Sequence, residues 1–164
     1  DLISVGLYTS VKLLSTRTVL ASRDDADKLG LEPGSEVVRC ARLRYWHGEP
    51  YCHIVVDLPA AIGRRLTKRD YQGSILRALE DRLKIHIRDA QQTVRASLAD
   101  ATLAKLLDTR IGAPLLAIDR VVMADDGTRV ERVRTHYRSD IYSFAVHLHR
   151  DRDQRSWKAP AKRR

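Results

Sequence analysis

Four segments that alternate apolar and polar residues, joined in pairs by tight turns, most strongly constrain how this chain folds. They are the segments 36–46, 51–58, 115–124 and 129–138. His47-Gly48 separates the first pair, and Asp125-Asp126-Gly127 separates the second. Glycine in such a turn tolerates the positive φ that hairpin turns require. The pattern therefore predicts two antiparallel β-hairpins.

The remaining periodic segments extend the hairpins into a larger fold. Strand patterns occur at 11–21, 85–96 and 142–149, and helix patterns at 24–30, 74–83 and 100–107. Gly30 ends the first predicted helix, Ser74 can cap the second, and Ser97 or Asp100 can cap the third. A chain of 164 residues suits one domain. We predict an α+β fold with a mostly antiparallel sheet and its helices on one face.

The distribution of charge separates a body from a basic tail. The net charge is +9, and residues 150–164 hold seven Lys or Arg against two Asp or Glu, so the tail accounts for 7 − 2 = +5. Elsewhere the charges of both signs are interspersed, which makes the body a weak candidate for binding a phosphate backbone. We expect an interdomain linker remnant at 1–10, a folded domain at 11–149 and a disordered basic tail at 150–164.

The chain start and the cysteines indicate the context of the protein. The sequence begins at Asp1 and its only methionine is Met123, so we expect a missing N-terminal domain. No apolar run approaches the roughly 20 residues that span a bilayer, and no signal-peptide pattern is present. Cys40 and Cys52 offer no disulfide framework, which fits a reducing compartment. We expect a cytoplasmic protein without membrane contact.

Polar residues fall on the expected core face of two strands. In the segment 129–138, Glu131 and Tyr137 share a face with Val133, whereas the basic residues occupy the face expected to be wet. In the segment 36–46, Arg42 and Arg44 continue an apolar face and form a fork suited to phosphate or carboxylate. A buried charge is costly unless it is paired or lines a cavity. The alternative is that both arginines reach solvent or pair with Glu131.

Several motifs occur in the order of a known family. They include Arg42-Leu43-Arg44, the turn 47–50 (HGEP), Leu58-Pro59, the segment 112–116 (GAPLL) and the segment 137–140 (YRSD). Over residues 11–148 this order resembles the UTRA domain, the ligand-binding half of HutC-type regulators in the GntR superfamily. The resemblance implies a fold like that of chorismate lyase, a small-molecule effector and a homodimer. It also implies that operator DNA is bound only through an N-terminal winged helix-turn-helix absent from this chain.

The resemblance also implies which residues line the pocket. The family's two arginines fall on Arg42 and Arg44, its helix-opening serine on Ser74, its acidic residue on Glu131 and its aromatic hydroxyl on Tyr137. The chain departs from the family at one position, because Ile54 stands where many relatives have a glutamate. Loss of that carboxylate leaves a drier and more positive pocket. We expect a ligand with an anionic end and an apolar body.

The sequence also allows three other interpretations. A chorismate lyase-like enzyme is the main alternative, since an arginine pair with one glutamate suits that reaction, but no catalytic or cofactor motif occurs. We therefore expect no catalytic residues and no cofactor. A nucleic-acid-binding module would rest on the basic tail alone. His147 and His149 share a strand face, yet no third ligand completes a metal site, so we expect no bound metal.

Overall fold

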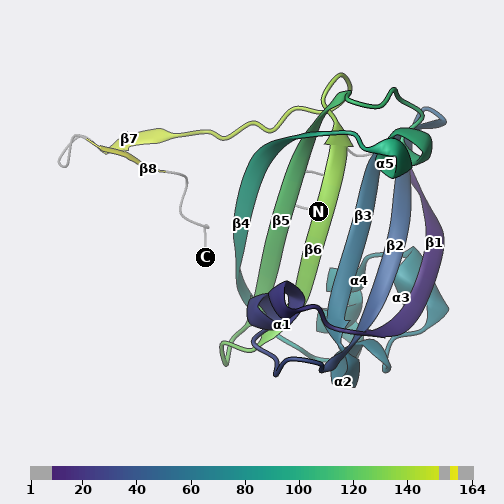
Figure 1. Ribbon diagram of the computed structural model, residues 1–164. Coiled ribbons are helices and arrows are strands. Elements are labelled where there is room, and N and C mark those ends of the chain that lie inside the picture. The colour runs from purple at the N-terminus through teal and green to yellow at the C-terminus, as the bar shows by residue number, and fades with distance from the viewer. Residues whose placement is uncertain (1–8, 152–155, 159–164) are drawn as a thin grey trace.

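A six-stranded antiparallel sheet forms the body of the protein (Figure 1). The computed structural model describes residues 9–151 and 156–158. The strands lie in the order β1-β2-β3-β6-β5-β4. Their bounds are β1 (Thr9–Leu20), β2 (Glu36–Trp46), β3 (Glu49–Pro59), β4 (Ile87–Leu98), β5 (Pro114–Ala124) and β6 (Arg129–Arg138). The antiparallel sheet of the predicted α+β fold is confirmed, and β1 begins two residues before the predicted start.

Both predicted hairpins are present. The β2–β3 turn contains His47 and Gly48 at φ values of 49° and 84°, and the β5–β6 turn contains Gly127 at 84°. These left-handed conformations explain why glycine stands in both turns. The two hairpins join through β3 and β6, where Ile54 lies opposite Thr135. Residues that are distant in the sequence therefore share the centre of the sheet.

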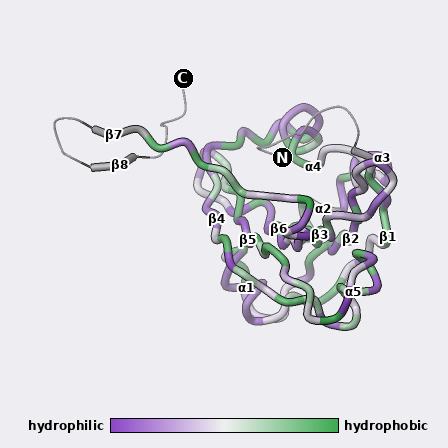
Figure 2. The backbone as a smooth tube through the Cα atoms, turned by 90° about the horizontal axis from the view of Figure 1, so that it is seen from above, coloured by the Kyte–Doolittle hydropathy of each residue, from purple (hydrophilic) through white to green (hydrophobic). Residues whose placement is uncertain are grey.

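Helices cover both faces of the sheet, in contrast to the predicted single face (Figure 2). One face carries α1 (Arg23–Leu29) and α5 (Ala101–Leu106). The other carries α2 (Ala60–Gly63), α3 (Lys68–Gln72), α4 (Ile75–Arg77) and the π-helical turn η1 (Ala78–Arg82). The physical reason lies in β2, which is apolar on both sides. Val37 packs in the cluster with α1 and Leu43 in the cluster with α5, while Val38 belongs to the main core on the opposite face.

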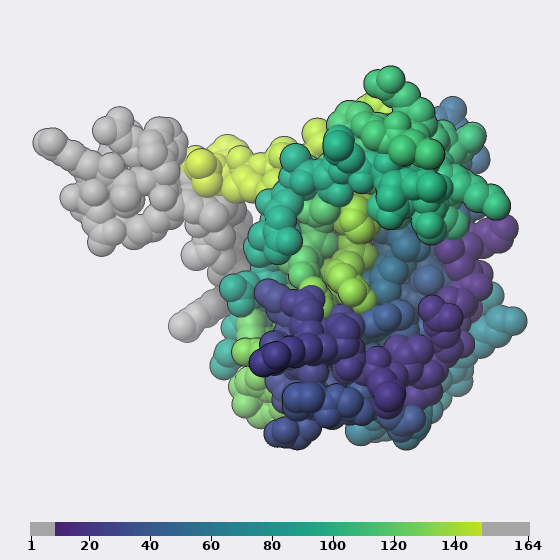
Figure 3. Space-filling view, viewed as in Figure 1, coloured from purple at the N-terminus to yellow at the C-terminus, as the bar shows by residue number. Residues whose placement is uncertain are grey.

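The basic face of β6 is buried at Val130 and Arg132 and half-buried farther along the strand, which corrects the prediction that this face is wet. Val130 and Arg132 are buried on it, and the α1 residue Asp25 packs against Arg132. Figure 3 shows this side of the molecule, with α1 over its lower part and the segment around α5 over its upper part. The prediction failed because alternation separates the two faces of a strand but does not say whether a helix covers the second one.

An ion-pair network between α1 and the sheet includes the buried Asp25, Asp57 and Arg132. The partly exposed Arg39, Arg134 and Asp119 complete it, and the exposed Asp24 also pairs with Arg132. Arg39 Nη2 lies 2.8 Å from Asp25 Oδ2, and its Nε lies 2.6 Å from Asp57 Oδ1. Arg132 Nη1 lies 2.8 Å from Asp25 Oδ1. Since each buried carboxylate meets at least one guanidinium group, the network ties α1 to β2, β3, β5 and β6.

The C-terminal part differs from its prediction. Residues 142–148 follow β6 without pairing as the predicted strand, and all but Tyr142 are exposed. Beyond them, β7 (His149–Asp151) pairs with β8 (Ser156–Lys158), in a region predicted to be disordered. The prediction of disorder rested on the many charged side chains, whereas the pairing of β7 with β8 uses main-chain hydrogen bonds, which depend little on side-chain pattern. Residues 1–8, most of the predicted linker remnant, lie outside the described residues.

Within the described part, no helix is long and apolar enough to cross a membrane.

Gly63 in α2 is expected to tolerate no side chain. A Cβ built there would lie 2.5 Å from Val38 Cβ and 3.1 Å from the Tyr71 hydroxyl. Gly63→Ala should destabilise the protein by about 1–3 kcal/mol, because the core must shift to admit a methyl group. Urea unfolding measures this change. Gly73→Ala serves as the control, since its Cβ would be 3.4 Å from the nearest atom, Arg69 O. Equal stability of the two variants would show that the core yields freely.

Candidate ligand-binding site

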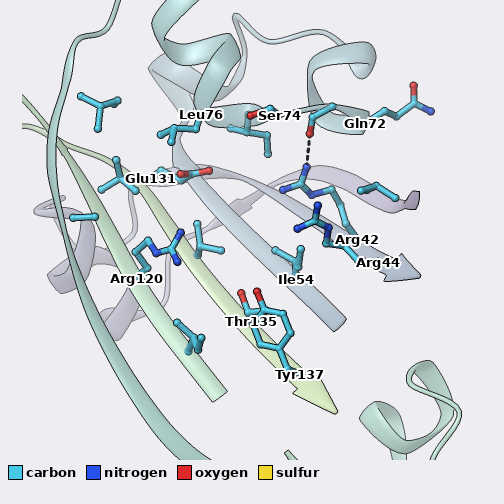
Figure 4. Close-up of a pocket in the computed structure, with 18 of the residues that line it drawn as sticks. Arg42, Arg44, Ile54, Gln72, Ser74, Leu76, Arg120, Glu131, Thr135 and Tyr137 are labelled. Carbon is cyan, nitrogen blue, oxygen red and sulfur yellow. Dashed lines mark hydrogen bonds between the residues drawn. The ribbon is translucent and has the colours of Figure 1, made fainter. Parts of the chain in front are cut away.

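A cavity of about 340 Å³ lies between the sheet and the segment 72–76 (Figure 4). Its floor is formed by alternate residues of β2, β3, β5 and β6 on the face opposite α1, and β4 closes one side. All six predicted site residues line it: Arg42, Arg44, Ile54, Ser74, Glu131 and Tyr137. The structure therefore brings together residues from three strands and one helix start around a single hollow.

Arg42 and Arg44 point from β2 into the cavity (Figure 4). Arg42 Nη1 donates to Gly73 O at 2.8 Å and to Tyr71 O at 3.3 Å, which ties the strand to the segment above it. Its Nε is buried and has no hydrogen-bond partner among the described residues. Arg44 lies near the Tyr51 phenol and forms a hydrogen bond with it. Both side chains are half-buried, so the fork predicted from the sequence faces the cavity.

Glu131 is a carboxylate in an apolar setting. Its residue surface is only 5% exposed, and the cavity wall beside it includes Val122 and Val133. Burial raises the pKa of Glu131 to about 7, and the positive charges of Arg42 and Arg120 oppose this shift only in part. The group is thus held close to its titration point near neutral pH, where a ligand can change its protonation.

Arg120 is a third cavity arginine that the sequence reading missed. Its Nε donates to Gln92 Oε1 at 2.8 Å, which holds the guanidinium group over the cavity floor (Figure 4). Alternation along β5 places Arg120 on the same face as Ile118 and Val122, both of which line the cavity. The sequence criterion that identified Arg42, a charged residue on the apolar face of an alternating strand, applies equally to Arg120.

The remaining predicted residues differ in their roles. Tyr137 stacks on Tyr142 with ring centroids 3.9 Å apart. Burial, together with the nearby Cys52, raises the pKa of its hydroxyl, so Tyr137 acts as a neutral group. Ser74 caps α4 by accepting a hydrogen bond from Arg77 N, and its exposed side chain stands at the cavity rim. Ile54 belongs to the main core and lines the floor as an apolar residue.

Other lining residues carried no clear signal in the sequence. Gln72 is the last residue of α3, Gly73 follows it in a bend, and Thr135 is a small polar residue in β6. Asp89 follows a register shift in β4, which interrupts the alternation that would have placed it. Among the described side chains, no group of three or more His, Cys, Asp or Glu residues is arranged to hold a metal ion. The cavity thus combines three arginines and two acidic residues with an otherwise largely apolar lining.

Comparisons with known proteins agree on one family. A family model described as the UTRA domain matches residues 4–143. The HTH-type transcriptional repressor NagR of Bacillus subtilis (strain 168) is 27% identical over 150 residues, which cover 92% of this chain and 62% of that protein. An HTH-type transcriptional regulator of Mycobacterium tuberculosis is 30% identical over 154 residues, which cover 91% of this chain and 56% of that protein. The chain spans about three fifths of the length of these relatives.

Solved structures agree with the family model. The ligand-binding domain of a GntR-family transcriptional regulator from Bordetella bronchiseptica superposes with a TM-score of 0.81 at 25% identity, covering 88% of this chain and 92% of that one. The effector domain of PhnF from Mycobacterium smegmatis superposes with a TM-score of 0.79 at 26% identity, covering 86% and 87%. The named relatives are transcription regulators, not enzymes, which disfavours the lyase alternative. The chain belongs to the UTRA domain family of GntR-type transcription regulators.

Proposed function

We propose that this chain is the effector-binding domain of a bacterial transcription regulator and that its effector is a small anionic metabolite. In this proposal the effector modulates DNA binding by an N-terminal winged helix-turn-helix, and the regulator is a homodimer. The observation that carries the proposal is the cavity lined by Arg42, Arg44 and Arg120. A cavity of about 340 Å³ is at the small end of the range for metabolite pockets.

The charges of the cavity favour an anion. Three arginines face one buried glutamate whose pKa of about 7 leaves it only partly charged at neutral pH. The guanidinium groups of Arg42 and Arg44 project side by side and can bind a carboxylate or phosphate with two parallel hydrogen bonds. The buried Nε of Arg42 is a donor that a ligand oxygen or a water would satisfy. An anion beside Arg42 would supply an acceptor for this Nε, which no described residue satisfies.

The apolar part of the cavity favours a ligand with few hydroxyl groups. The walls include Ile54, Ile75, Leu76, Ile87 and Ile118. Ile54 lies opposite Arg42 in the β2–β3 pairing, so an apolar side chain stands directly beside the arginine fork. A sugar ring would leave its hydroxyl groups without partners against these walls, whereas an aromatic or aliphatic body would not.

Titration calorimetry with two kinds of probe tests the ligand class. Benzoate and phenylacetate represent aromatic carboxylates, and glucosamine 6-phosphate represents amino-sugar phosphates. We expect the aromatic carboxylates to bind more tightly, with a negative heat-capacity change from apolar burial. Preferential binding of the sugar phosphate would contradict the apolar ligand body. Failure of every anion to bind would contradict the proposed sensor.

Arg44→Met should weaken binding of the best anionic probe by about 10- to 100-fold, because a charge-assisted hydrogen bond contributes about 1.5–3 kcal/mol. Arg44 is the cleaner target of the two, since Arg42 also anchors the segment 71–73. Calorimetry measures the affinity, and Arg64→Met is the matched control because Arg64 is exposed and pairs with Glu36 outside the cavity. Equal loss in both variants would indicate a general charge effect rather than a contact in the cavity.

A further inference from the structure

Asp89 lines the cavity, and its two carboxylate oxygens have different surroundings. Oδ2 accepts a hydrogen bond from the Nε of the exposed Arg88 at 2.9 Å. Oδ1 is buried and has no hydrogen-bond partner among the described residues. A buried acceptor without a partner costs free energy unless water or a ligand donates to it. Oδ1 therefore marks a place in the cavity wall where an effector can donate a hydrogen bond.

An irregularity in β4 turns Asp89 toward the cavity. The pairing of β4 with β5 skips Arg88, which lies between Ile87 and Asp89. Asp89 and its neighbour Ala90 both line the cavity, although successive residues of a regular strand point to opposite faces. Bulges of this kind redirect side chains and often lie next to functional sites. The orientation of Asp89 therefore follows from the local backbone and not from the alternation of the strand.

Asp89 and the arginine fork stand on opposite sides of the cavity. Arg42 and Arg44 belong to β2 and Asp89 belongs to β4, and β3, β6 and β5 lie between these two strands. Neighbouring strands are about 4.8 Å apart, so four spacings separate the two sides by roughly 19 Å along the sheet. The arginine side chains reach into the cavity and shorten the free distance (Figure 4). One elongated ligand can therefore contact both sides.

The charges on the β4 side favour an uncharged donor over a cation. Glu131 is the second acidic residue of the cavity, whereas Arg120 and Arg88 are basic. Arg120 reaches toward β4, where its Nε donates to Gln92 Oε1 at 2.8 Å (Figure 4). Because two acidic and two basic residues lie on this side, an ammonium group gains little net attraction there. An uncharged N–H group can donate to Asp89 Oδ1 without adding a charge.

We propose that Asp89 selects effectors that carry an uncharged nitrogen donor at the end opposite their anionic group. In this arrangement the anion binds Arg42 and Arg44, the apolar body lies over Ile54 and its apolar neighbours, and the donor binds Asp89 Oδ1. A site with a buried acceptor rejects an analogue that lacks the donor, because the acceptor is then left unpaired. This inference rests on the proposed anion-binding function and names a second group that the effector carries.

Titration calorimetry at pH 7 with two matched pairs of probes tests this selection. The first pair is 4-aminophenylacetate and 4-methylphenylacetate, and the longer pair is 4-(4-aminophenyl)butanoate and 4-(4-methylphenyl)butanoate. Within each pair an uncharged amino group replaces a methyl group of nearly the same size. The amino member of at least one pair should bind the wild-type chain about 10- to 100-fold more tightly, which is the range for a hydrogen bond to a charged acceptor.

Asp89→Leu should abolish the preference for the amino member while the methyl member still binds, which shows that the cavity is intact. The matched control Asp81→Leu removes an exposed carboxylate outside the cavity and should keep the preference. Equal affinity of both members for the wild type, or a preference that survives in Asp89→Leu, would overturn the role of Asp89 and leave the anion-binding proposal intact. If no anionic probe binds the wild type, the role of Asp89 and the proposed function both fail.

Discussion

Glu131→Gln is expected to stabilise the protein at pH 8 by about 3 kcal/mol. The cause is the cost of holding a carboxylate in the cavity wall, since burial raises the pKa of Glu131 from 4.5 to about 7. A group with a raised folded-state pKa binds a proton more tightly in the folded than in the unfolded state, so the native protein loses stability as pH rises from 4.5 to 7. Glutamine has nearly the same shape and avoids that loss.

Urea unfolding at pH 8 and pH 4 measures the effect. The difference between Glu131→Gln and the wild type should be largest at pH 8 and should nearly vanish at pH 4, where the carboxyl group is protonated in both states. Glu80→Gln is the control, because Glu80 is an exposed glutamate in η1. A destabilised Glu131→Gln variant at pH 8 would show that the carboxylate is well paired in the native state. If Glu131 lowers the stability of the native protein, this would fit a binding role, because binding sites often contain residues that reduce stability.

Asp25→Ala is expected to destabilise the protein by about 3 kcal/mol. Asp25 is buried beneath α1 and faces Arg39, Arg132 and Arg134 at distances of 2.8, 2.8 and 3.3 Å. Its removal leaves guanidinium groups without this partner, and Arg132 has little access to water. The value lies at the low end for a broken buried ion pair because Arg132 keeps Asp119 at 2.7 Å.

The pH dependence and a control on the same helix support the assignment. Burial by itself would raise the pKa of Asp25, but the hydrogen bond with Ser22 and the charges of Arg134 and Arg39 outweigh it and hold the pKa below the usual 3.8. The contribution of Asp25 is therefore present above pH 3.8 and is lost at lower pH, so the penalty of Asp25→Ala should shrink between pH 7 and pH 3. Asp27→Ala, on an exposed position of α1, should cost little at either pH. Equal penalties in both variants would assign the effect to the helix rather than to the network.

These two carboxylates show how the faces of one sheet divide structure from function. On the α1 face, each buried carboxylate meets arginines at short distance, and the network fixes the helix to the strands. On the cavity face, the arginines and Glu131 leave a hollow between them. On the α1 face, the protein itself supplies the partners of the charged groups. In the proposed function, a ligand supplies partners to the charged groups of the cavity.

Local chemistry along the chain was enough to predict the hairpins and most of the cavity floor. Turn glycines and alternation predicted β2, β3, β5 and β6. The two-residue repeat of a strand placed Arg42 and Arg44 on the same face of β2, and Glu131 and Tyr137 on the same face of β6. These features depend on neighbours in the sequence, because the direction of each side chain in a strand follows from its position. Arg120 was within reach of the same test.

Contacts between distant segments decided the rest. Pairing of β3 with β6 brought the two predicted faces together around one cavity, and packing of α1 over Arg132 buried a face that its charges had marked as wet. The apolar alternation of residues 142–149 predicted a strand, and this was wrong for residues 142–148, which form no strand in the structure. Sequence periodicity determines which residues share a face. Only the tertiary structure decides what covers that face, because the covering element comes from elsewhere in the chain and the free energy of its packing is not a local property.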